Sequence, residues 1–289
     1  MDNIYQRLGM GSTNQSSNSG GLLPQLIFSG VIVILIYLTF VFTEIIYNYI
    51  NRLSMNRTPL LKDTNVMDDK SVTIAQNPNI PRSNPVHLSV NERSGIEFSY
   101  SFFVNVNPST FRQEYGLLHL FHKGYSTQFP LLAPGVYLRS DTNTLRVYMN
   151  TYKTWNNFIE VDNFPVSKWV HVVIVCKDHS LEIYINGNLS KKMSFDGFAP
   201  YQNYQDIICF SQRRITLKKA MVPSLDDNGL DVFGSAKGMM SRLNYFSYAV
   251  CYAEIQQLMA EGPSSKMDSA LVANPPPYLA DTWWASSNH

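Results

Sequence analysis

Residues 168–192, KWVHVVIVCKDHSLEIYINGNLSKK, predict two β-strands joined by a tight turn and followed by a third strand. The first strand, WVHVVIVC, is apolar on both faces, so we expect it to lie inside a sheet that is covered on both sides. In the second, every other residue from Leu181 to Ile185 is apolar, which is typical of a strand with one buried face. The dipeptide Asn186-Gly187 supplies the two positive-φ positions of a type I′ turn.

The same period of two continues over residues 86–262. IEFSYSFFVNV alternates apolar and polar side chains, and further short runs are rich in β-branched and aromatic residues. Turn-forming segments such as NPS, APG and KDHS separate these runs, and no helical pattern interrupts them. The sequence therefore predicts an all-β fold, an antiparallel two-sheet jelly-roll sandwich.

Two motifs in this region resemble the laminin G and pentraxin branch of the concanavalin A-like lectin/glucanase superfamily. In that branch a Trp-x-His strand is followed by a strand that ends in Tyr-x-Asn-Gly. The stretch GMMSRLNYFSYAVCYAEIQQL resembles the closing strand, turn and short helix of the same group. The resemblance implies a concanavalin A-like jelly roll, within which we expect a buried Trp169 and a structural role for His171. The residues at the first motif's positions are Trp169, His171, Tyr184, Asn186 and Gly187.

A long apolar segment precedes the predicted sandwich. The run LIFSGVIVILIYLTFVF, residues 26–42, carries no charge, and about 20 such residues span a bilayer as a helix. The polar stretch STNQSSNSGG stands where a signal peptide would have a basic region, so an uncleaved anchor is favoured over a signal peptide or a buried core helix. Basic residues lie mainly after the span, which predicts a lumenal N-terminus and a cytosolic C-terminal domain. These residues are Arg7 before it and Arg52, Arg57 and Lys62 after it.

Composition divides the chain into five parts. Residues 1–21 form a polar N-terminal segment and residues 22–50 the transmembrane helix. Residues 51–85, rich in proline and asparagine, are expected to form an extended linker, or strap, that could reach on the order of 100 Å. The laminin G-like jelly roll occupies residues 86–262, and a proline-rich tail occupies residues 263–289.

The tail holds a short motif with a known mode of recognition. Pro275, Pro276 and Tyr278 match the Pro-Pro-x-Tyr pattern that WW domains bind in a polyproline II conformation, although four-residue matches also arise by chance. Trp283 and Trp284 are better suited to docking on a protein surface than to solvent.

Charge and cysteine content exclude some classes of function. The net charge is +1 and no basic cluster is present, so nucleic acid is not an expected partner. The three cysteines, Cys176, Cys209 and Cys251, are odd in number, and two end apolar runs. They predict free thiols in a reducing compartment rather than a disulfide framework.

Catalytic and metal-binding patterns are sparse. Retaining glycosidases need two carboxylates about 5 Å apart, and Glu160 and Asp162 share a strand face, but Phe164 takes the next in-phase position. We therefore expect no enzyme activity. His119 and His122 are three residues apart, which on a regular strand places them on opposite faces and disfavours joint metal ligation.

No cofactor is predicted, and calcium is the one metal that the resemblance brings into question. Many proteins of that superfamily hold calcium with loop carboxylates. The stretch SLDDNGLD offers Asp226, Asp227 and Asp231, but it lacks a recognisable calcium-binding spacing and is read as a solvated turn. For glycan binding, the best local candidates are Tyr152 and Trp155 in NTYKTWNN.

Together these features predict a non-catalytic, membrane-anchored structural or interaction protein with a lipid membrane and neighbouring proteins as partners. A membrane-anchored, lectin-like glycan-binding module is the alternative. An anchor, a strap and one jelly roll are also similar in arrangement to virion membrane proteins of large nucleocytoplasmic DNA viruses. That similarity implies a minor capsid or membrane-linking protein, located between an internal membrane and the capsid proteins.

Overall fold

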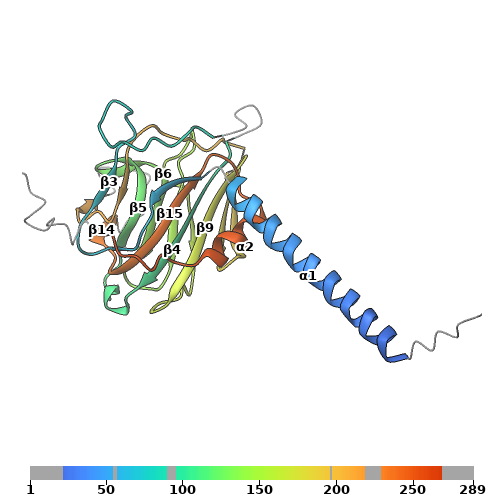
Figure 1. Cartoon of the computed structure of the whole chain (residues 1–289). Helices are drawn as coiled ribbons and strands as arrows, with labels where there is room; N and C mark the ends of the chain where they lie inside the picture. Colours follow the sequence, from blue (N-terminus) through green and yellow to red (C-terminus); the bar gives the residue numbers. More distant parts are fainter. Residues whose placement is uncertain (1–21, 55–56, 90–95, 196, 219–228, 269–289) are drawn as a thin grey trace, which may run out of the picture. The chain divides into compact units, whose positions relative to one another are not determined.

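A computed structural model describes residues 22–54, 57–89, 96–195, 197–218 and 229–268. The chain divides into two compact units, an N-terminal helix and a β-sandwich (Figure 1).

The N-terminal unit is helix α1, Leu22–Ser54, of 33 residues. It extends four residues beyond the end of the predicted transmembrane segment. Its stretch Leu26–Tyr47 has the length and apolar composition needed to cross a membrane, and none of that stretch is buried. At about 1.5 Å per residue these 22 residues measure about 33 Å, close to the thickness of a hydrocarbon core.

The first sheet of the sandwich has seven strands, and all of its pairings are antiparallel. In spatial order they are β1 (Arg57–Leu61), β15 (Gly238–Phe246), β4 (Phe98–Val106), β9 (Trp169–Lys177), β10 (Ser180–Ile185) and β11 (Asn188–Ser194), with β2 (Asn65–Val66) also paired to β15.

The second sheet has eight strands and branches at β5, which pairs with β14 and β12 on the side away from β6. Its β14–β5 pairing is parallel, which departs from the predicted purely antiparallel sandwich. In spatial order the strands are β13 (Arg214–Leu217), β14 (Leu230–Ser235), β5 (Leu117–Tyr125), β6 (Gln128–Arg139), β7 (Leu145–Tyr148) and β8 (Phe158–Val161), with β12 (Ile207–Cys209) between β5 and β3 (Val72–Ile74). The short helices are η1 (Pro108–Thr110) and α2 (Tyr252–Glu261).

The main core lies between the two sheets and is rich in aromatic side chains. Tyr100 and Phe102 of β4 and Phe121 of β5 are fully buried. The ring centroid of Phe121 lies 5.7 Å from that of Tyr100 and 5.3 Å from that of Phe102. Such pairs add about 0.5–1.5 kcal/mol beyond the burial of their area. The predicted two-sheet jelly roll is confirmed.

The hairpin of residues 168–192 forms as predicted. Strand β9 lies inside the first sheet, between β4 and β10, and residues 170–176 are all buried. Asn186 (φ 48°) and Gly187 (φ 79°) both have the positive φ of a type I′ turn. Trp169 is only half-buried, contrary to the prediction, because it is the first residue of β9 and pairs with Asn105 near the end of β4.

Asn186 also holds the backbone of the neighbouring strand. Its side-chain Oδ1 accepts a hydrogen bond from the N–H of His171 (2.9 Å), and its own N–H donates to the carbonyl of His171 (2.8 Å). The last regular pair of this ladder is Ile185 with Val172, so the side chain of Asn186 adds one more rung. We call this pair of bonds the Asn186 clamp.

Helix α2 covers the outer face of the first sheet (Figure 1). Its Gln256 side chain donates to the carbonyl of Gly187 at the hairpin turn. At its last residue, Glu261 bonds to Arg57 of β1 (2.9 Å) and to Arg242 of β15 (3.0 Å). Ile255 of α2 is fully buried. This cover explains why β9 is apolar on both faces.

The predicted strap is part of the sandwich. Residues 51–85 contain the end of α1 and strands β1, β2 and β3, which pair with β15 and β12. After β3, Asn84 donates to the carbonyl of Pro59, and the N–H of Gln76 donates to Asp206. A free strap that reaches on the order of 100 Å is therefore wrong, since these residues are fixed to the sheets.

The first residues of the predicted tail are also bound to the domain. Thr64 and Met267 form a parallel bridge, and the N–H of Asp268 donates to the carbonyl of Thr64. Ser264 donates to Asp63. The N-terminal and C-terminal ends of the sandwich thus meet at one edge.

We predict that Asn186→Ala lowers the free energy of unfolding by about 2–4 kcal/mol. The change leaves the buried N–H of His171 without its acceptor and forces alanine into a left-handed backbone conformation. Asn186→Gly should cost less, because it removes the hydrogen bond but keeps the positive φ. Urea unfolding of the full chain in detergent, followed by tryptophan fluorescence, measures both values.

The matched control for this experiment is Asn188→Ala, since Asn188 follows the turn and is exposed. Equal stability of Asn186→Ala and Asn188→Ala would show that the clamp does not stabilise the fold.

Candidate functional site

The residues of the Trp-x-His and Tyr-x-Asn-Gly motif make structural contacts. The hydroxyl of Tyr184 donates to Glu182 (2.8 Å), which also accepts from Lys192 (2.7 Å). Burial and the bond to Glu182 raise the pKa of Tyr184 to about 12. Tyr184 lines a surface groove of about 580 Å³ that runs along the first sheet to the start of α2.

His171 is enclosed in the sheet. It is 2% exposed, its ring stacks on Phe103 with centroids 4.7 Å apart, and its Nε2 lies 2.9 Å from the hydroxyl oxygen of Ser101. Burial lowers the pKa of His171 to about 4, so the ring is neutral at pH 7. A buried neutral ring of this kind does not contact substrate, which agrees with its expected structural role.

His119 and His122 contact each other, contrary to the prediction that they lie on opposite faces. The register of β5 against β6 shifts between His119 and Phe121, and both Leu120 and Phe121 enter the main core. This irregularity returns His122 to the face of His119, and His119 Nε2 lies 2.7 Å from His122 Nδ1.

The two rings form a chain of hydrogen bonds with one consistent proton arrangement. The N–H of Ser211 donates to His119 Nδ1 (3.0 Å), so His119 carries its proton on Nε2 and donates to His122. His122 then donates from Nε2 to the carbonyl of Tyr125 (2.9 Å). Both rings are therefore neutral, and burial lowers the pKa of His119 well below its usual value and that of His122 to about 4.

The candidate carboxylates are occupied by structural contacts. Glu160 in β8 and Asp162 just after that strand are both on the outer side of the sheet, and Phe164 is buried in the main core. Glu160 bonds to Arg146 (2.8 Å) and lies 3.8 Å from Arg139, while Asp162 accepts from Thr144. A carboxylate occupied by two guanidinium groups is poorly placed to act as a general acid on a substrate.

The two candidate glycan contacts do not form one surface. Tyr152 is 71% exposed, and its ring lies 5.2 Å from that of Tyr201. The neighbouring Phe198 is 41% exposed and lies under the ammonium of Lys153 (4.5 Å). We call Tyr152, Phe198 and Tyr201 the aromatic patch. Trp155 instead packs edge-on against Phe129, as part of a smaller apolar cluster on the second sheet.

Other predicted positions fall elsewhere. Asp231 lies in β14 and pairs with Thr216. Pro275, Pro276 and Tyr278 of the WW-type motif lie outside the described residues, as do Asp226, Asp227, Trp283 and Trp284. Among the residues that the structure describes, no group of three or more His, Cys, Asp or Glu could hold a metal ion.

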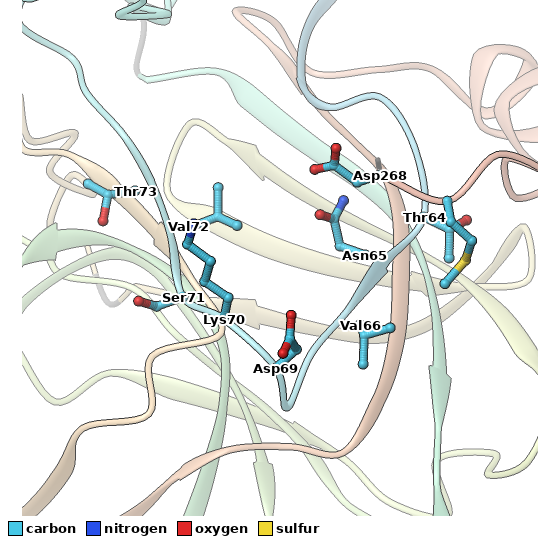
Figure 2. A pocket seen from close by; sticks show the side chains of 10 residues that line it. Thr64, Asn65, Val66, Asp69, Lys70, Ser71, Val72, Thr73 and Asp268 are labelled. Carbon is cyan, nitrogen blue, oxygen red and sulfur yellow. The ribbon is translucent and has the colours of Figure 1, made fainter. Parts of the chain in front are cut away.

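A cavity of about 300 Å³ lies at the edge where the two sheets part (Figure 2). Figure 2 shows Asn65 and Asp268 on one side of it and Val72 and Thr73 on the other. Lys70 is a further lining residue. Because the walls come from the predicted strap and tail, this cavity could not be predicted from local sequence patterns. Its mixed lining suits binding more than catalysis.

We predict that the stability of the domain falls as the pH drops below about 6.5. The pKa values of His119, His122 and His171 are lowered in the folded state, so the unfolded chain binds more protons below its ordinary histidine pKa of about 6.5. Each histidine then removes about 1.4 kcal/mol at pH 5.5. Urea unfolding at pH 7.5 and 5.5 measures the loss.

His122→Gln should reduce this loss by roughly a third, because it removes one of three such groups. The control is His179→Gln, since His179 is an exposed histidine outside the core. If the free energy of unfolding is the same at both pH values, the lowered pKa values assigned to the three buried histidines are wrong.

Comparison with solved structures finds partial similarity at low sequence identity. The binding domain of botulinum neurotoxin serotype D is 13% identical, with a TM-score of 0.44 over 71% of this chain and 42% of that chain. The binding domain of Paraclostridial Mosquitocidal Protein 1 is 15% identical, with a TM-score of 0.38 over 72% of this chain and 47% of that chain. The chain thus spans less than half the length of either structure. No curated protein matches the sequence.

A sequence profile matches the middle of the chain. It covers residues 81–210, from the last part of the predicted strap through β12, and includes the whole hairpin of residues 168–192. The profile is that of the concanavalin A-like lectin/glucanases superfamily, and the two-sheet sandwich of this chain is a concanavalin A-like fold.

Proposed function

We propose that this protein is a membrane-anchored binding module, in which α1 spans a bilayer and the jelly roll contacts a protein partner on the cytosolic side. The observation that carries the proposal is the character of α1. Its stretch Leu26–Tyr47 is apolar and unburied, and its serine and threonine hydroxyl groups bond to the helix itself. In lipid every polar group needs such an internal partner. The hydroxyls are those of Ser29, Thr39 and Thr43.

Free thiols support the cytosolic side. Cys176 and Cys209 are both fully buried in the main core and unpaired, and Cys251 is exposed and unpaired. Burial raises the pKa of the Cys176 and Cys209 thiols, which keeps them protonated and inert. Domains that mature in an oxidising lumen more often pair such residues.

Binding without catalysis fits the described chemistry. Glu160 is held by Arg146, and His171 is enclosed. The aromatic patch, by contrast, exposes large rings that soluble surfaces seldom leave uncovered, and aromatic side chains are enriched in protein interfaces. We therefore assign the contact with the partner to the patch side of the domain.

The narrower form of the proposal concerns the setting. An anchored jelly roll on the cytosolic face of an internal membrane would lie between that membrane and the capsid in a virion of a large nucleocytoplasmic DNA virus. This form rests on the arrangement of anchor and jelly roll, and it makes the capsid proteins the partner. Cross-linking of gently opened particles to a capsid protein through the aromatic patch would support it.

Glycan binding is the second candidate. It is favoured by the exposed ring of Tyr152, since sugars stack on such rings, and by the lectin-related superfamily of the matching profile. The nearby Asn157, however, uses its amide to bond Thr151 and Thr154 within the loop. This leaves that amide less able to bind a sugar hydroxyl.

We predict that a membrane-impermeant maleimide labels Cys251 on sealed microsomes that carry the full chain. The exposed thiol faces the cytosol in the proposed topology, whereas Cys176 and Cys209 stay unlabelled because they are buried. Cys251→Ser gives the background. A cysteine placed at Ser12 should be labelled only after the membrane is permeabilised.

The opposite pattern would invert the topology. If Cys251 is labelled only after permeabilisation and Asn188 carries an N-linked glycan, the domain is lumenal and the glycan-binding candidate replaces the proposal.

The glycan candidate has its own test. If it holds, the full chain in detergent binds members of a glycan array, and Tyr152→Ala removes that binding by taking away the stacking ring. The control is Tyr125→Ala, because Tyr125 is an exposed tyrosine at the β5–β6 turn. Under the protein-contact proposal, the wild-type chain shows no array signal that depends on Tyr152.

A further inference from the structure

A buried lysine at one end of the sandwich is not explained by the fold. Lys123 of β5 is 2% exposed, although lysine is almost never fully buried without a charged partner. Its ammonium donates to the carbonyl of Gln205. Burial lowers the pKa of Lys123 to about 8, which leaves it mostly charged at pH 7.

The ammonium has more donors than the described protein satisfies. An ammonium carries three N–H groups, and within the described residues Lys123 has one hydrogen-bond acceptor. Asp206 is close enough to favour the charge, but no ion pair joins the two, and its Oδ1 accepts from the N–H of Gln76. Two donors therefore remain for a ligand or for water.

Lys123 lines a small cavity of about 70 Å³. Three amide side chains share the lining, and each has its bonds within the protein. Gln202 donates to Tyr245 and accepts from Ser89, and Asn203 donates to the carbonyl of Lys123. The third, Gln76, donates to the carbonyls of Ile74 and Asn84 and accepts from Val86. Lys123 is thus the one charged residue of the lining, and its ammonium has two hydrogen-bond donors to spare.

The rim of the cavity is apolar and exposed. Tyr204 is 69% exposed and Leu88 is 47% exposed, and both line the cavity. The cation of Lys123 is complementary to an acidic side chain. The exposed Tyr204 and Leu88 are complementary to an apolar residue next to that acidic one. The volume holds a few water molecules or a single carboxylate group.

We propose that the cavity at Lys123 binds a carboxylate from an acidic side chain of the partner protein, while Tyr204 and Leu88 pack against the apolar residue beside it. This inference rests on the proposed function, since it names the chemistry of the partner. A free small acid would use the same cation, so the test separates the two sources.

The experiment measures binding of capped dipeptides to the full chain in nanodiscs by saturation-transfer NMR. The probes are N-acetyl-glutamyl-leucine amide, its glutaminyl counterpart, and sodium acetate, all at constant ionic strength. We expect the glutamyl peptide to bind about tenfold or more tightly than the glutaminyl peptide, because only the carboxylate makes charge-assisted bonds to the ammonium.

Lys123→Met should abolish the preference for the glutamyl peptide. Methionine is similar in length and apolar, so it suits a buried site and the fold should persist. The matched control is Lys153→Met, because Lys153 is an exposed lysine outside this cavity and should leave binding unchanged. If Lys123→Met does not fold, Tyr204→Ser and Leu88→Ser test the exposed rim and should each weaken glutamyl binding several-fold.

Three results would overturn the proposal. Equal binding of the two peptides, or undiminished glutamyl binding by a folded Lys123→Met, would leave a hydrated structural lysine. Binding of acetate without the glutamyl peptide would assign the cavity to a free small acid. None of these results affects the labelling of Cys251, so failure here and failure of the proposed topology are distinguishable.

Discussion

The two hydrogen bonds between Asn186 and the backbone of His171 join the hairpin turn to the central strand β9. They set where β10 ends on β9, and they hold the turn in the conformation that presents the Gly187 carbonyl to Gln256. A Cβ on Gly187 would lie 2.5 Å from the Gln256 amide nitrogen, so the turn needs glycine both for its φ and for this approach. Helix α2 is thereby placed over β9, and at its other end Glu261 ties down β1.

Local patterns predicted the elements that local sequence determines. The period of two and the Asn186-Gly187 turn identified β9, β10 and the jelly roll, because alternation and positive φ are properties of the segment itself. Strands β1, β2 and β3 were missed because they have five, two and three residues, too few to show a period. Their pairing depends on β15 and β12, which lie far along the chain. The irregularity in β5 was missed for another reason: the period of two assumes regular pairing, and the register of β5 against β6 shifts between His119 and Phe121.

The candidate sites were less predictable than the fold. In NTYKTWNN the sequence does not distinguish the aromatic ring that faces solvent from the one that packs inward, and the structure separates Tyr152 from Trp155 on this basis. Lys123 stands next to a glycine, in a place where a solvated lysine would be ordinary. It is buried because Gln76 from the predicted strap and Leu88, which follows that strap, close over it together with Asn203. A site built from three distant segments leaves no local signal.

The polar groups inside the sandwich also bear on where the domain can work. A series of hydrogen bonds runs from Ser211 through His119 and His122 to Tyr125. It is complete only while both histidine rings are neutral, because the Nδ1 atom of each ring already accepts a hydrogen bond. A proton added to either ring would place two donors face to face in a buried site. Near neutral pH this arrangement is stable, whereas an acidic lumen would work against it. The buried, unpaired Cys176 and Cys209 are likewise suited to a reducing compartment. These two features of the core, one governed by protons and one by redox state, are compatible with the cytosolic placement that we propose.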